Sequence, residues 1–143
     1  MPLPDPQPGL VISYAYLWRR EQEAGRVEGV KNRPCAIVLV TEQAEAGKSV
    51  IVVPITHSPP ADLDAAIEIP AATKKRMGLD SERSWVVISE VNRFRWPGPD
   101  LAPVPGTSDR FDYGFLPPGL HQQIKTRFVE RVRTRKVTLT GRD

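Results

Sequence analysis

Four residues carry side chains that could hold a phosphate group or move a proton. Arg33 stands where a polar segment meets an apolar run, and there a guanidinium can present a rigid fork of donors to a phosphate. Thr56 ends another apolar run and can donate a hydroxyl hydrogen bond, with Ser58 as a second donor. His57 lies between them, and an imidazole can serve as acid or base. Together these side chains suit chemistry at a phosphate.

Each of these residues also has a structural interpretation. Arg33 could cap a turn at the surface, Thr56 could close a local hydrogen-bonded turn, and His57 could face water from a loop. Glu90 follows an apolar strand, where an unpaired carboxylate is costly, so it needs a partner. We expect Arg33 to be that partner. The pair would orient the arginine, leave Glu90 as a base, or be a purely structural ion pair.

The candidate metal ligands are few and scattered. His57, His121 and Cys35 are far apart in the chain, and the acids form no obvious cluster of the kind that holds magnesium. Cys35 lies in the apolar run 35–40 and reads as a buried thiol, and one cysteine allows no intramolecular disulfide. We therefore expect no metal and no other cofactor.

Aromatic residues next to arginines are candidates for stacking on bases. Trp96 follows Arg93 and Arg95, whereas Trp85 opens an apolar strand and reads as a core residue. A packed loop is the plainer interpretation of Trp96. The chain of 143 residues has a net charge of +3, which is compatible with a nucleic-acid partner without indicating one.

The elements that must position these residues are mostly short strands. Alternation and β-branched content predict strands over 10–18, 35–40, 49–55, 66–69 and 85–91 and an edge strand over 136–140. Helical spacing predicts helices over 71–77, stopped by Gly78, and over 120–132. We expect loops over 19–29 and 41–48, an irregular arm over 1–8, and a long Pro/Gly-rich loop over 97–119.

These elements predict one mainly β domain over 1–143, a small barrel with short helices, one of them near the C-terminus. Periodicity does not choose between an SH3-like barrel, an OB-fold and a split sheet. No apolar run is long enough to span a membrane and the N-terminus lacks a signal peptide, so we expect a cytoplasmic protein.

Three ordered segments resemble the MazF/PemK/Kid toxins. Gly29 to Pro34 leads into the run CAIVLV, as in the Arg-Pro junction of those toxins. Val52 to Ser58 resembles their strand that ends in proline, an apolar residue and Thr or Ser, and Trp85 to Asn92 resembles a strand that ends on an acid. The chain departs from some members at Ile88, where they carry arginine, and in lacking a histidine near the first strand.

The resemblance implies an SH3-like barrel that cleaves single-stranded RNA without a metal, through attack of a 2′-hydroxyl. It implies catalytic roles for Arg33, Thr56, His57 and Glu90, and we expect Lys31, Ser58, Arg93 and Trp96 to contact the RNA. The implied partners are an antitoxin protein and a second copy of the chain. The alternatives are a catalytically inactive barrel that binds RNA or a protein, and an OB-like binding module.

Overall fold

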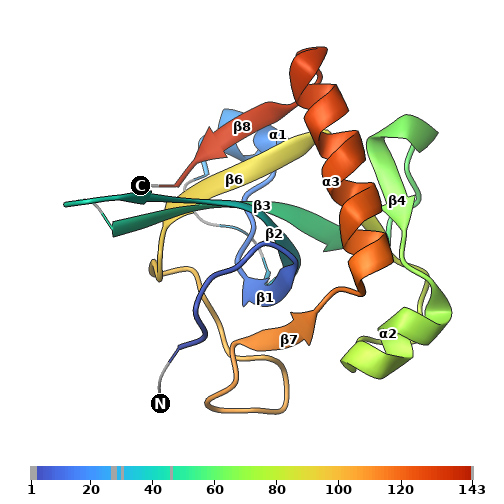
Figure 1. Ribbon diagram of the computed structural model, residues 1–143, viewed down its shortest axis with the longest axis horizontal. Coiled ribbons are helices and arrows are strands. Elements are labelled where there is room, and N and C mark those ends of the chain that lie inside the picture. Colours follow the sequence, from blue (N-terminus) through green and yellow to red (C-terminus); the bar gives the residue numbers. More distant parts are fainter. Residues whose placement is uncertain (1–2, 27–28, 30, 46, 143) are drawn as a thin grey trace.

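The computed structural model describes residues 3–26, 29, 31–45 and 47–142. Residues 1–2 of the expected arm, 27–28 and Val30 of the expected loop and motif, residue 46 and Asp143 lie outside the described residues. The fold is mainly β, as predicted, and Figure 1 shows a curled sheet with α3 across one face. The strands are β1 (Leu10–Tyr14), β2 (Arg33–Gln43), β3 (Gly47–Thr56), β4 (Ala66–Glu68), β5 (Trp85–Val87), β6 (Glu90–Arg95), β7 (Asp112–Phe115) and β8 (Thr138–Gly141). The helices are α1 (Arg19–Glu23), α2 (Ala71–Met77) and α3 (Pro118–Arg133), with a short 3-10 turn over Leu63–Ala65.

The sheet curls because the central strand β3 changes partner along its length. The strand order is β4-β5-β3-β2-β1-β7, while β6 also pairs with β3 and β8 pairs with β6. Val52 of β3 lies opposite Asn92 of β6, whereas Ile55 lies opposite Val86 of β5. The pairs are antiparallel except for β6 with β8. The result is the small, half-closed barrel expected from the sequence.

The segment 85–91, predicted as one strand, forms two. The chain leaves β5, buries Ile88, and starts β6 at Glu90, so that the two strands pair with different stretches of β3. The local sequence shows only one continuous apolar run. It does not reveal the break, because the change of strand partner depends on residues far away in the chain. The break places Glu90 at the beginning of a new strand.

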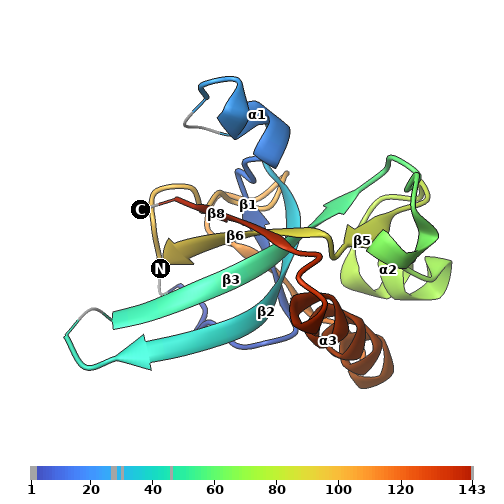
Figure 2. The ribbon, with the colours of Figure 1, turned by 90° about the horizontal axis from the view of Figure 1, so that it is seen from above.

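Other boundaries also differ from expectation. The predicted connection 41–48 is mostly strand, since the ladder continues to Gln43 opposite Gly47, and Figure 2 shows this β2–β3 hairpin extending away from the rest of the fold. The first strand stops at Tyr14 rather than at residue 18. The predicted loop 19–29 contains the single helical turn α1, and the predicted loop 97–119 contains β7. Polar, solvent-exposed strands and one-turn helices show little hydrophobic periodicity, so the sequence does not predict them.

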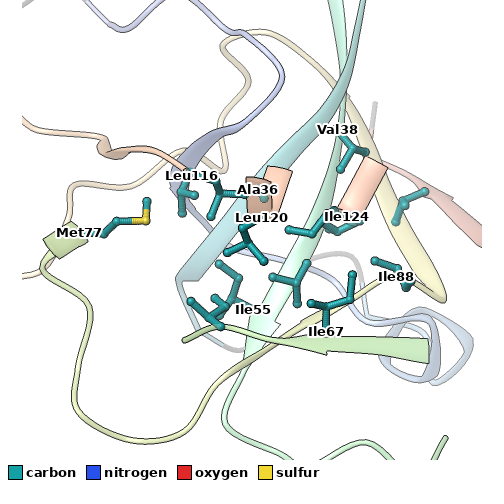
Figure 3. Packing of buried hydrophobic residues seen from close by; sticks show 14 residues of the cluster. Ala36, Val38, Ile55, Ile67, Met77, Ile88, Leu116, Leu120 and Ile124 are labelled. Atoms are coloured by element: carbon teal, nitrogen blue, oxygen red, sulfur yellow. The ribbon is translucent and has the colours of Figure 1, made fainter. Parts of the chain in front are cut away.

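Two apolar clusters fill the fold on the two faces of the curled sheet. Leu120 and Ile124 of α3 pack onto the sheet in the first cluster, together with Ala36, Ile55 and Ile88 (Figure 3). The helix spacing predicted over 120–132 is confirmed, and α2 ends as predicted at Gly78, which has a left-handed φ of 75°. The second cluster includes Cys35, which is fully buried as expected, and burial raises the pKa of its thiol. Among the described residues, no helix is long and apolar enough to cross a membrane.

Candidate functional site

A cleft of about 450 Å³ lies where β2 begins and β3 ends. Its walls come from four parts of the chain: the segment before β2, the end of β3, the α2–β5 region, and the stretch that leads into β7. The predicted residues Lys31, Arg33 and His57 all border it. The other lining residues are Asn32, Pro34, Ile55, Lys74, Gly78, Leu79, Asp80, Ser84, Val104, Pro105 and Tyr113.

Arg33 is half-buried at the start of β2, not exposed as a turn cap would be. Its guanidinium lies 5.1 Å from the ring centroid of Trp18, and Nη1 donates a long hydrogen bond of 3.4 Å to the carbonyl of Ile55. Its Nε is buried without a hydrogen-bond partner among the described residues. Burial lowers the pKa of Arg33, because the charged form loses solvation. The guanidinium is therefore held in place, but not all of its N–H groups have hydrogen-bond acceptors.

Thr56 ends β3 between Ile55 and His57, which both border the cleft. The β2–β3 ladder ends at the pair of Cys35 and Pro54, so Arg33 and Thr56 each lie two residues beyond its last pair. The backbone N–H of the exposed Ser58 donates to Thr56 Oγ1 at 3.2 Å, so the local threonine turn weighed above is present. The Thr56 hydroxyl accepts in that bond, and its own proton stays available for donation.

His57 is held by two acids that the sequence did not single out. Its Nε2 lies 2.7 Å from Asp80 Oδ2 and its Nδ1 lies 3.6 Å from Glu82 Oε2. Asp80 also accepts from the buried Lys74 at 2.7 Å, and Lys74 contacts Ser84 and the Glu82 carbonyl as well. Partial burial works against it, but Lys74 and His57 hold the pKa of Asp80 below its usual value.

These contacts bring His57 together with two acids that lie near each other later in the chain, and all three could be metal ligands. One atom each from His57, Asp80 and Glu82 lies within 4.8 Å of the others, and all three residues are exposed. A nitrogen and two carboxylate oxygens suit a divalent cation in type. The ammonium of Lys74 already occupies the other oxygen of Asp80. The sequence carried no spacing signal that joins the histidine to the acids, because His57 follows β3 whereas Asp80 and Glu82 lie in the α2–β5 connection.

Glu90 does not pair with Arg33, so that prediction was wrong. Its Oε1 accepts from the Tyr16 hydroxyl at 3.1 Å and from the Arg19 backbone N–H at 3.0 Å. Glu90 is half-buried, and burial raises the pKa of its carboxyl. It borders a second hollow of about 560 Å³ that involves α1 and the α3–β8 connection, rather than the cleft. Glu90 contacts Tyr16 and Arg19 because β6 begins next to the segment that leads into α1.

Arg93 and Trp96 lie away from the cleft. Arg93 is exposed on β6 opposite Ile51, and Trp96 packs with its ring centroid 6.0 Å from that of Phe94. The backbone N–H of Trp96 donates to the Lys48 carbonyl, so its surroundings are those of a packed strand end. The structure thus brings together Lys31, Arg33 and His57, with Thr56 between cleft-lining neighbours, and separates them from Glu90, Arg93 and Trp96.

The family comparison covers the segments that build most of this cleft. The model of the PemK-like, MazF-like toxins of type II toxin–antitoxin systems matches residues 17–95, more than half of the chain. The matched stretch contains Arg33, Thr56, His57 and Glu90, while the cleft residues Val104, Pro105 and Tyr113 lie beyond it. Among curated proteins, none matches the chain. The chain belongs to the family of PemK-like, MazF-like toxins of type II toxin–antitoxin systems.

Proposed function

We propose that this toxin is an endoribonuclease that cuts single-stranded RNA without a metal ion, by attack of a 2′-hydroxyl on the adjacent phosphate. The observation that carries the proposal is the cleft where β2 begins and β3 ends, which Arg33 and His57 border while Thr56 lies between two of its lining residues. A guanidinium, a hydroxyl and an imidazole are the groups that such a transesterification uses. Membership of the toxin family supports the same conclusion.

Each group takes one role in the proposed reaction. The 2′-oxygen loses its proton and bonds to phosphorus, and the bond to the 5′-oxygen of the next nucleotide breaks. Arg33 and the Thr56 hydroxyl stabilise the charge on the non-bridging oxygens of the phosphorane. His57 mediates the net transfer of one proton from the 2′-oxygen to the 5′-oxygen, which leaves as a hydroxyl, and Asp80 Oδ2 orients the ring at 2.7 Å from Nε2. We assign proton transfer to His57 rather than to Glu90, because Glu90 borders the other hollow.

The proposed partners are single-stranded RNA, an antitoxin and a second copy of the chain in the cytoplasm. For the second copy we propose an apolar groove of about 600 Å³ between α3 and the strands β2, β3, β6 and β8. Leu39, Val129, Val132 and Leu139 border this groove and remain between 37% and 50% exposed. An isologous contact would set this apolar surface against itself, and monomers rarely leave such a surface uncovered.

The test is cleavage of a labelled single-stranded RNA in excess EDTA. We expect cleavage to persist, with a 2′,3′-cyclic phosphate on the 5′ fragment and a 5′-hydroxyl on the 3′ fragment. A substrate with 2′-methoxy sugars should bind and stay intact, because the nucleophile is absent. Cleavage of that substrate, or activity that EDTA abolishes and magnesium restores, would refute the mechanism. Binding without cleavage of any RNA would favour the inactive barrel, in which Thr56 and His57 serve only the turn and the ion pairs described above.

A further inference from the structure

Two arginines share the indole of Trp18. The Arg20 guanidinium lies 4.9 Å from the ring centroid and the Arg33 guanidinium lies 5.1 Å from it. Trp18 is only 7% exposed, so its ring supports the two cations and is not itself free to stack on a base. Two like charges held near one ring repel each other, and an anion in contact with both would relieve that repulsion. The unpartnered Nε of Arg33 fits the same interpretation.

Arg20 also borders the second hollow, where positive charge is concentrated. The hollow of about 560 Å³ is lined by five cationic side chains and two carboxylates, together with Ser89, Val137 and Thr138. The cations are Arg19, Arg20, Arg131, Arg135 and Lys136, and the acids are Glu23 and Glu90. This surplus equals the net charge of +3 that the whole chain carries.

The two acids of the hollow are already engaged. Glu23 accepts from Arg19 at 3.1 Å, and Glu90 accepts from Tyr16 and the Arg19 backbone. Arg131 donates to the backbone carbonyls of Asp64 and Lys136, which are dipoles and leave its charge uncompensated. Glu90 also interacts electrostatically with Arg20 and Arg19, so the hollow is left with more cations than acids rather than with wholly unneutralised ones.

The Trp18 pair joins this hollow to the cleft. Arg33 borders the cleft, Arg20 borders the hollow, and both guanidiniums lie over the indole of Trp18. We propose that a single-stranded RNA runs from the cleft across Arg33 and Arg20 and that its next phosphates bind in this second hollow. The proposal rests on RNA being the substrate, as argued above. It adds a sequence-independent contact to the backbone outside the catalytic cleft, because guanidinium and ammonium groups there read phosphate rather than base edges.

The test measures binding of 2′-methoxy RNA by fluorescence anisotropy, since this RNA cannot be cleaved by the proposed route. Two lengths are compared, about 4 nucleotides to fill the cleft and about 12 to reach the hollow. The variant is Arg20→Gln with Lys136→Gln, both exposed residues of the hollow. The matched control is Lys75→Gln with Arg76→Gln, two exposed residues of α2 that border neither site, so both variants lose two positive charges.

We expect the hollow variant to bind the longer RNA about 25-fold more weakly near 0.1 M salt, because each phosphate contact on a single strand contributes a salt slope of about 0.7. The salt slope should fall by about 1.4. The control variant should lose little affinity, and the shorter RNA should bind all three proteins alike. Thermal unfolding of each variant verifies that it is folded.

Three results would overturn the proposal: equal losses in both variants, no loss in the hollow variant, or a loss that is the same for both RNA lengths. Failure of the proposed nuclease activity gives a different pattern. If the wild-type protein cuts no RNA but the hollow variant selectively loses affinity for the longer RNA, the proposed RNA binding in the hollow is supported and the proposed nuclease activity is refuted. If the wild-type protein binds no RNA, both proposals fall.

Discussion

The substitution Arg33→Ala should abolish most catalysis while leaving the protein folded. On the proposed mechanism, Arg33 donates to charge that develops only in the transition state. Losing one such donor typically costs about 100-fold or more in rate. We therefore expect the single-turnover rate of RNA cleavage to fall by at least about 100-fold, with a smaller effect on RNA binding.

The effect on stability follows from the contacts of Arg33. Its interaction with the Trp18 ring contributes about 0.5–1 kcal/mol at a site of this exposure. Its hydrogen bond to Ile55 is 3.4 Å long and adds little. Burial of the guanidinium and of its unpartnered Nε opposes these gains. We expect a net change below about 1 kcal/mol, which corresponds to a shift in Tm of about 2–4 °C for a domain of this size.

The assay combines cleavage of a labelled RNA in EDTA with thermal unfolding followed by circular dichroism. Arg33→Lys keeps the positive charge but loses the planar fork, so it should recover only part of the activity. Arg76→Ala removes an exposed guanidinium of α2 that does not border the cleft, and it should cut at the wild-type rate. A wild-type rate for Arg33→Ala would remove this residue from the mechanism. A fall in Tm of more than about 10 °C would show that activity is lost through folding instead.

Further predictions concern the other residues of the two sites and the association of the chain. Thr56→Val keeps the shape of the side chain and removes its hydroxyl, so turnover should drop while the unfolding midpoint falls only slightly; normal turnover with a clear loss of stability would assign Thr56 to the turn alone. Because burial raises the pKa of Glu90 above its usual 4.5, the folded protein loses stability as the pH rises from about 4.5 through the folded-state pKa. Glu90→Gln should therefore unfold at a higher temperature than wild type at pH 7, and the gain should fade toward pH 4; a gain that is independent of pH would contradict this cause. Light scattering should show a dimer at micromolar concentration that Leu139→Asp converts to a monomer, because the carboxylate would lie in the apolar groove; a wild-type monomer would refute the interface.

Local patterns in the sequence were enough to predict the elements that bury one face. The spacing of Leu120 and Ile124 predicted α3, and Gly78 predicted the end of α2 because a left-handed residue there costs glycine nothing. The apolar run after Arg33 predicted β2, and the resemblance to the toxins singled out Arg33, Thr56 and His57. The predictions of α2, α3 and β2 succeed because helix and strand periods repeat within a few residues, whereas the roles of Arg33, Thr56 and His57 stay predictions.

Only the tertiary structure decided which side chains meet. Glu90 pairs with Tyr16 rather than with Arg33 because the chain breaks at Ile88 and β6 starts beneath a segment more than 70 residues earlier. His57 meets Asp80 because β3 ends beside the α2–β5 connection. The contacts of Arg20 and Arg33 with the Trp18 ring need α1 and β2 to be folded. Such contacts join segments that are far apart in the chain. Periodicity describes only residues within one helix or strand, so it cannot predict these contacts.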